Sequence, residues 1–196
     1  MRLTKEVVVK IPFVKKTIGN YLQKRIKAVV FEIEGFLKGS KTIIDVGTGS
    51  GYIAFELQKR GYNVTPIDVT NISFIPEIKP IIYDGRKLPF KDKSFDVCLL
   101  ISVLHHTKNP EAVLEEAIRV SKKIVIDEDL HKNKLQKIRT MVMDSALNWE
   151  FFNHPHSNKD DTEWRELFKK KGLRLIDAQY HPWGLGFLSV TYNLET

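Results

Sequence analysis

Three glycines at alternating positions mark a place where this chain can approach a ligand closely. They lie in the stretch 45–51, which follows the apolar run 42–44 and precedes a helical pattern over 52–57. Because glycine has no Cβ, the main chain can come near a bound group, and the first N–H groups of the helix would point toward that group. The stretch therefore predicts a site for a nucleotide-like ligand.

The spacing of the glycines bears on which ligand this is. The dinucleotide fingerprint places its third glycine three residues after the second, to let helix and strand pack closely. Tyr52 occupies that position here, and the third glycine, Gly51, comes one residue earlier. The pattern is acid-x-Gly-x-Gly-x-Gly, and motifs further along the chain must decide the ligand.

Two aspartates follow predicted strands and could hold a nucleoside. Asp68 ends the strand expected at 63–68, where a carboxylate can accept hydrogen bonds from both hydroxyls of a ribose. Asp84 and Gly85 open the stretch 83–90, which continues as Leu-Pro-Phe. The plainer alternatives are a capping or turn role for Asp68 and a simple Asp-Gly turn at residue 84.

The apolar run 95–101 ends at Ser102 and is followed by His105 and His106. A helix opened by an Asn cap and a proline is expected over 110–120. Together with the earlier motifs, this order resembles class I S-adenosylmethionine-dependent methyltransferases, in particular the ubiquinone/menaquinone-type (methyltransferase type 11) group. The resemblance spans roughly residues 42–128.

The resemblance implies an α/β Rossmann-like fold, with a mostly parallel seven-stranded sheet, helices on both faces and a C-terminal antiparallel hairpin. It implies S-adenosylmethionine as cofactor, S-adenosylhomocysteine as product, and in-line methyl transfer to a small-molecule acceptor. Asp68 would bind the ribose, Asp84 the adenine amino group, and the Gly85 N–H a ring nitrogen. The expected cofactor-binding residues are Asp45, Gly47, Thr48, Gly49, Gly51, Asp68, Val69, Asp84, Gly85 and Ser102.

His106 is the candidate catalytic residue, either as a general base or as a side chain that only holds its loop. Glu128, His154 and His156 are candidate substrate contacts, because they would follow the fifth strand at the ligand-binding end of the sheet. The histidines and acids after residue 127 match no metal-ligand spacing, so no metal site is predicted. Cys98 is expected to be a buried filler rather than a nucleophile.

The chain of 196 residues, 42% hydrophobic and 28% charged, predicts a single methyltransferase domain over 1–196. Its parts would be a basic arm and amphipathic lid helix (1–40), a cofactor-binding core (41–128), substrate-side helices and loop (129–172) and a hairpin (173–196). The expected strands are 42–47, 63–68, 80–83, 95–101, 122–127, 173–180 and 186–193, with helices at 14–37, 51–60, 110–120, 131–148 and 161–171. The turn of the hairpin is expected at 182–184.

One segment departs from the family pattern. The family normally places a helix between its second and third strands, but two prolines lie within 71–80 here. That segment has room for little more than a turn.

The net charge of +7 lies in the first part of the chain, because residues 1–41 hold ten Lys/Arg against three Glu and residues 42–196 hold 21 of each sign. A basic arm leaves two alternatives open: an RNA or protein methyltransferase, or a solvated helix face of no special function. A non-catalytic cofactor-binding partner subunit is a further alternative. The single cysteine, and the absence of a signal-peptide pattern or an apolar run of membrane-spanning length, favour the cytoplasm.

Overall fold

The computed structural model describes residues 26–131, 159–183 and 187–196, and these form one seven-stranded sheet. The strand order is β3-β2-β1-β4-β5-β7-β6, and β7 runs in the opposite direction to the other six strands. This confirms the predicted fold class. The strands are β1 (Thr42–Val46), β2 (Asn63–Asp68), β3 (Ile81–Ile82), β4 (Phe95–Ile101), β5 (Ser121–Leu130), β6 (Arg174–Trp183) and β7 (Phe187–Glu195).

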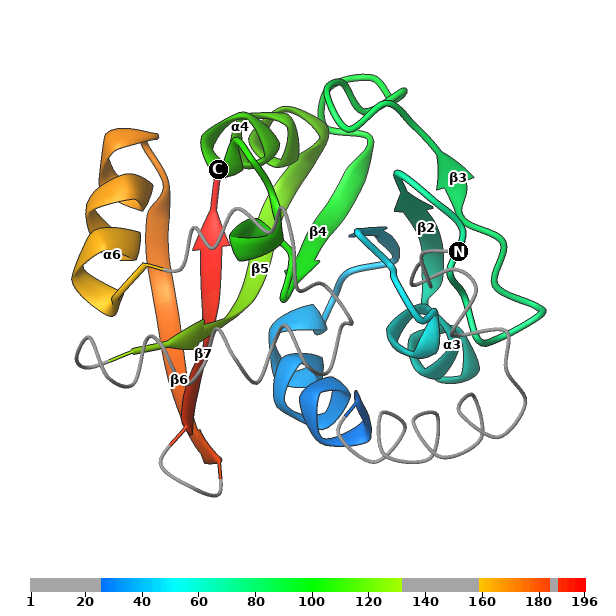
Figure 1. Ribbon diagram of the computed structural model, residues 1–196, viewed down its shortest axis with the longest axis horizontal. Helices are drawn as coiled ribbons and strands as arrows, with labels where there is room; N and C mark the ends of the chain where they lie inside the picture. The colour runs from blue at the N-terminus through cyan, green and yellow to red at the C-terminus, as the bar shows by residue number, and fades with distance from the viewer. Residues whose placement is uncertain (1–25, 132–158, 184–186) are drawn as a thin grey trace, which may run out of the picture.

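Helices cover both faces of the sheet (Figure 1). On one face, α4 (Pro110–Val120) and α6 (Asp161–Lys170) bury Leu114 and Trp164 in a shared apolar core. On the other face, the helix over 26–34, the short η1 (Gly35–Leu37) and α3 (Tyr52–Lys59) form a second core. A third short helix, η2 (Leu104–His106), follows β4. The strands between the two cores are apolar on both faces, as parallel sheets require.

The helix caps follow the sequence. The Asn109 side chain accepts the Ala112 N–H at 3.1 Å with Pro110 in the first turn, so the predicted start of α4 is confirmed. At α6, Asp160 and Glu163 form a capping box, in which each side chain accepts the other residue's main-chain N–H.

The prediction of a turn over 182–184 was wrong at its first two positions, because β6 runs on to Trp183. Pro182 is tolerated there because β6 pairs only with β7, so its missing N–H falls on an edge strand. β5 is also longer than predicted: it extends to Leu130 because β7 pairs with it as far as Leu188.

The segment 69–80 contains no helix, as the two prolines predict, and β3 is reduced to two residues. The helix expected over 131–148 lies outside the described residues. Within the ranges described, no helix is long and apolar enough to cross a membrane.

Candidate cofactor and methyl-transfer site

The glycine loop lies between the end of β2 and the segment after β4. Gly47, Gly49 and Gly51 have φ of +71°, +51° and +81°, a region that glycine occupies without strain. The Gly47 N–H donates to the Ile67 carbonyl at 2.8 Å. A Cβ on Gly47 would lie 2.8 Å from Val103 Cγ2, so this position requires glycine for space as well as for conformation.

Asp68 ends β2 and holds the glycine loop. Its Oδ2 accepts the Gly49 N–H at 2.8 Å, and its Oδ1 accepts the N–H groups of Val69 at 2.7 Å and Thr70 at 3.3 Å. A carboxylate has about four lone-pair sites, so these three bonds leave capacity for a ligand hydroxyl. Asp68 thus lies beside the glycine loop, and its predicted role as the ribose acceptor remains a prediction.

Asp45, at the end of β1, is 2% exposed and accepts the Thr48 hydroxyl at 2.6 Å. Burial raises the pKa of the Asp45 carboxyl to about 6; the Thr48 bond opposes this shift and the nearby charge of Asp68 adds to it. The hydrogen bond between Thr48 and Asp45 thus stabilises the glycine loop from within. The sequence motif had placed both among the cofactor-binding residues.

The loop after β3 begins at Asp84, which is exposed. Its Oδ1 accepts the N–H groups of Arg86 at 2.9 Å and Lys87 at 3.3 Å, and these bonds lower the pKa of the Asp84 carboxyl. A Cβ on Gly85 would lie 3.1 Å from Val69 Cγ1, so this loop approaches the end of β2 closely. Val69 itself is 57% exposed.

The chain leaves β4 through a strained turn. Ser102 has φ +54°, and its N–H donates to the Asp127 carbonyl at 2.8 Å. Beyond it, Glu128 Oε1 accepts the N–H groups of Val103 at 3.2 Å and Leu104 at 2.8 Å. Glu128 Oε2 pairs with His105 Nδ1.

His105 and Glu128 are each 1% exposed, so this pair is fully buried and fastens η2 to β5. Sequence reasoning singled out His106 and missed His105. The available signal was the pairing of a glutamate at the end of one strand with adjacent histidines after the neighbouring strand. The predicted substrate role of Glu128 remains a prediction, and its described contacts are with the η2 segment.

His106 is partly buried, and its ring lies beside that of His105 in a tilted arrangement, with ring centroids 4.1 Å apart and an angle of 40° between the ring planes. The main-chain N–H of His106 donates to the Val103 carbonyl at 3.0 Å. Its role as a base remains a prediction. His154 and His156 lie outside the described residues.

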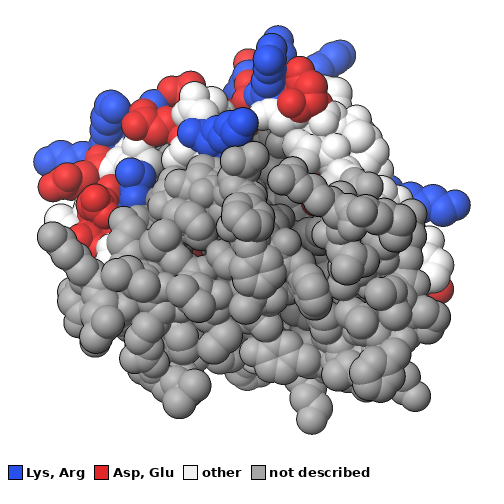
Figure 2. All heavy atoms as spheres, viewed as in Figure 1, with Lys and Arg blue, Asp and Glu red and all other residues white. Residues whose placement is uncertain are grey.

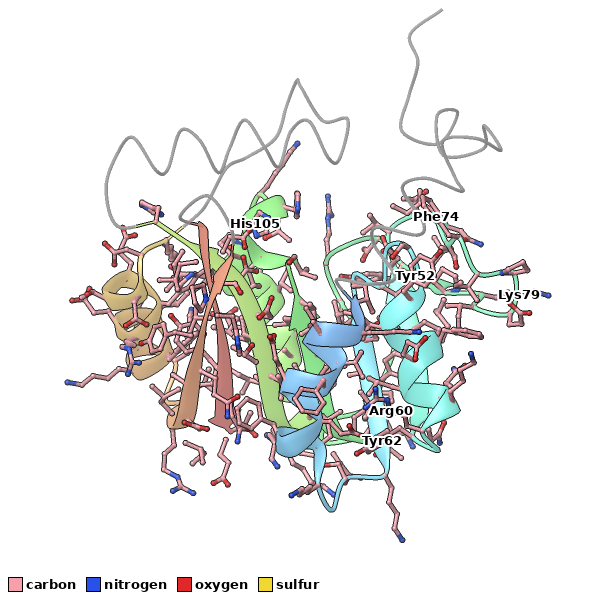
Figure 3. All side chains as sticks on the ribbon, turned by 90° about the horizontal axis from the view of Figure 1, so that it is seen from below. Tyr52, Arg60, Tyr62, Phe74, Lys79 and His105 are labelled. Carbon is pink, nitrogen blue, oxygen red and sulfur yellow. The ribbon has the colours of Figure 1, made fainter. Side chains whose placement is uncertain are left out.

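The two ends of the sheet differ in what they carry. Figure 3 shows His105, Tyr52 and Phe74 at the end where β4 and β5 finish, whereas Arg60 and Tyr62 lie at the opposite end. The rings of Tyr52 and Phe74 meet edge to face at 6.3 Å, which brings the segment after β2 against the start of α3. The candidate ligand-binding elements therefore share one end of the sheet, the end at which ligands of open α/β folds bind.

The remaining candidates lie away from that end or form no cluster. Cys98 is fully buried in mid-strand, and burial raises the pKa of its thiol, as expected for a structural side chain. Among the described residues, no three His, Cys, Asp or Glu side chains gather in a way that could hold a metal ion.

Comparisons with known proteins agree with this geometry. Residues 44–124 match a family described as a methyltransferase domain. An uncharacterized protein of Methanocaldococcus jannaschii is 40% identical over 86 residues, covering 44% of this chain and 41% of the relative. A ubiquinone biosynthesis O-methyltransferase of Rickettsia bellii is 28% identical over 109 residues, covering 51% of this chain and 43% of the relative.

A crystal structure of a SAM-dependent methyltransferase from Thermotoga maritima has a TM-score of 0.67 at 17% identity, covering 94% of this chain and 97% of that one. The matched part of the chain spans less than half the length of the curated relatives above. The sheet order, the glycine loop and the match over residues 44–124 are similar to those of SAM-dependent methyltransferase domains, whose cofactor is S-adenosylmethionine.

Proposed function

We propose that this chain transfers the methyl group of S-adenosylmethionine to a small-molecule acceptor. The observation that carries the proposal is the convergence of Asp68 on the glycine loop, with the loop after β3 close by. The residues fit the cofactor: a Cβ on Gly49 would meet nothing nearer than the Gly47 carbonyl oxygen at 3.7 Å, which leaves open space beside Asp68.

In this proposal Asp68 binds the ribose, and its remaining lone-pair site accepts a ribose hydroxyl. Val69 and Gly85 border the adenine, and Asp84 accepts from its amino group. Asp45 and Thr48 hold the glycine loop in shape, and the Ser102 segment borders the methionine part. When bound, the cofactor supplies an electrophilic methyl group on a sulfonium that is already a good leaving group.

The protein's own contribution is then mainly to orient and desolvate the reactants. Holding the acceptor atom about 3 Å from the methyl carbon, in line with the departing sulfur, supplies most of the rate enhancement. His106 accepts a proton only if the acceptor atom must lose one. The buried His105–Glu128 pair keeps the segment that carries His106 in place.

Two observations support a small-molecule acceptor. The similar Rickettsia protein is a ubiquinone biosynthesis O-methyltransferase. The described side chains on the face shown in Figure 2 mix both signs of charge along its rim, in keeping with the zero balance of residues 42–196. We also propose a cytoplasmic location and a single domain.

Calorimetric titration of the folded protein with S-adenosylmethionine and S-adenosylhomocysteine tests the cofactor assignment. We expect saturable one-to-one binding of both, and no heat with either would overturn the proposal. Formation of S-adenosylhomocysteine with a panel of phenols, catechols and amines then tests transfer. A protein that binds the cofactor and methylates no panel member or RNA would favour the partner-subunit alternative.

The RNA alternative rests on the basic excess of residues 1–41. RNA affinity measured between low and physiological salt separates the two classes of acceptor. A steep fall of affinity with salt would indicate phosphate contacts, whereas no binding at low salt removes this alternative.

A further inference from the structure

Arg119, on α4, binds two main-chain carbonyls of the loop after β3. Its Nη2 donates to the Leu88 carbonyl at 2.9 Å, and its Nη1 donates to the Phe90 carbonyl at 2.7 Å. These carbonyls lie on either side of Pro89. A planar guanidinium with donors in fixed directions can thus fix both sides of the turn at once, which an ammonium group cannot do.

Glu116 lies one helical turn earlier on α4, and together with Arg119 it forms a clamp on the loop after β3. Its Oε2 accepts the Leu88 N–H at 2.7 Å, and its two oxygens accept from Arg119 Nε at 2.9 Å and Nη2 at 2.7 Å. The Arg119 bond is the main reason why the pKa of the Glu116 carboxyl is lowered. Glu116 is therefore ionised at neutral pH, and it holds the loop directly while it orients Arg119.

Along the chain, the hydrogen bonds made by the clamp follow directly on those made by Asp84. The N–H groups of Arg86 and Lys87 bind Asp84 Oδ1, and the next N–H along the chain, that of Leu88, binds Glu116. Three consecutive peptide groups are thus held by two carboxylates. A change in the orientation of the Leu88 peptide would pass directly to the Asp84 side chain.

Apolar packing alone does not fix this part of the loop. Leu88 is 2% exposed, and Phe90 packs edge to face against Phe95 at 5.0 Å, so both side chains are anchored in the core. Residues 84–87 precede these anchors and are exposed or partly exposed. Arg86 and Lys87 donate to Asp84, and the contacts of Glu116 and Arg119 begin at Leu88, the next residue along the chain.

We propose that Glu116 and Arg119 are positioning residues for adenine recognition: they do not touch the cofactor, but they set the orientation in which Asp84 and Gly85 meet the ring. The inference rests on the proposed function, which supplies the adenine assignment. It adds two residues of α4 that none of the glycine-loop or strand-end motifs includes.

The test compares two ligands in four proteins. Dissociation constants for S-adenosylhomocysteine, and for its analogue with a purine lacking the 6-amino group, are measured by calorimetry. The proteins are the wild type, Arg119→Lys, Glu116→Gln and the control Glu115→Gln. Glu115 is the neighbouring glutamate of α4, and it pairs with Lys171 at 2.6 Å instead of with the loop.

In the wild type, we expect loss of the amino group to weaken binding about tenfold, the value of one hydrogen bond to a charged acceptor. In Arg119→Lys and Glu116→Gln, the ratio of the two dissociation constants should fall to about twofold, because Asp84 no longer meets the amino group. Glu115→Gln should keep the wild-type ratio. Thermal melting of each variant shows whether the fold is retained.

The inference is overturned if both folded clamp variants keep the wild-type ratio of the two dissociation constants. An equal weakening of both ligands leaves that ratio unchanged, so it would indicate a purely structural clamp and would overturn the inference too. If Arg119→Lys does not fold, Glu116→Gln decides, since it keeps the shape of the side chain. If the wild type binds neither ligand, the proposed function itself fails. That result is distinct from failure of the clamp.

Discussion

Asp68 Oδ2 accepts the Gly49 N–H at 2.8 Å, across 19 residues of sequence. This bond joins the end of β2 to the loop after β1, and so it places an acidic group beside the open space at Gly49. The same carboxylate must then shape the loop and, in the proposed function, bind the ribose.

Asp68→Asn should weaken binding of S-adenosylhomocysteine by at least about tenfold, because a neutral amide loses the charged acceptor of several hydrogen bonds. Calorimetric titration measures the change. Asp177→Asn serves as the control, since Asp177 is an exposed residue of the edge strand β6. Equal affinities of the two variants would contradict the role of Asp68.

Gly49→Ala and Gly61→Ala form a matched pair. Both glycines have positive φ, +51° and +88°, and an added Cβ meets nothing closer than 3.7 Å at either site. Each substitution should cost about 1–2 kcal/mol of folding free energy through backbone strain. Only Gly49→Ala should also weaken cofactor binding, because its methyl group enters the space assigned to the ligand.

Urea denaturation and calorimetry measure the two effects of this pair separately. Gly51→Ala should be the most destabilising of the three, since its Cβ would lie 2.5 Å from Ser73 Oγ and 3.2 Å from Ile78. Unchanged cofactor affinity in a folded Gly49→Ala variant would argue against the assignment of the loop.

His105→Ala and His106→Ala should affect different properties: the first should lower the stability of the fold, and the second should lower the rate of methyl transfer if His106 is the base. Removal of His105 leaves the buried Glu128 Oε2 without its hydrogen-bond partner on η2 and should cost about 1–3 kcal/mol of stability. His106 is partly exposed, so its removal should cost less than about 1 kcal/mol.

If His106 is the base, its removal should lower kcat about 100-fold at unchanged KM. Denaturation curves and steady-state kinetics with an identified acceptor check the pair. A stable His105→Ala variant would show that the Glu128 pair contributes little to the fold.

Stability should depend on pH through Asp45. Its pKa rises from 3.8 to about 6 in the folded protein, so between these values the folded state binds more protons than the unfolded state. The free energy of unfolding should therefore contain a contribution that falls as pH rises from about 4 to 6, on the order of 3 kcal/mol in all. Asp45→Asn should remove that slope, which denaturation at closely spaced pH values would reveal.

Periodicity and turn residues were sufficient to predict the sheet. Each of β1, β2, β4 and α4 begins and ends within one residue of its expected position, because alternating elements with clear caps leave few other arrangements. Local patterns could not predict that β5 extends to Leu130 or that Pro182 lies in a strand. Both depend on pairing with β7, a contact between distant segments.

The cofactor loop could likewise be inferred, since its glycines and the strand-end Asp68 are consecutive motifs. The contacts that hold the loop after β3 could not, because Glu116 and Arg119 bind Leu88 across 28 and 31 residues and a single sequence contains no signal for such pairs. The His105–Glu128 pair left one signal, a glutamate near the end of one strand and adjacent histidines after the neighbouring strand.

The position of β7 has a consequence for synthesis. β6 precedes β7 in the chain, yet within the described part of the sheet β7 is its only neighbour. During synthesis β6 lacks its native partner, and the edge of β5 that β7 will occupy stays open, until the nine residues of β7 have been made. A nascent chain stalled before Phe187 would therefore expose β6 without its partner, together with the open edge of β5, to chaperones or to aggregation.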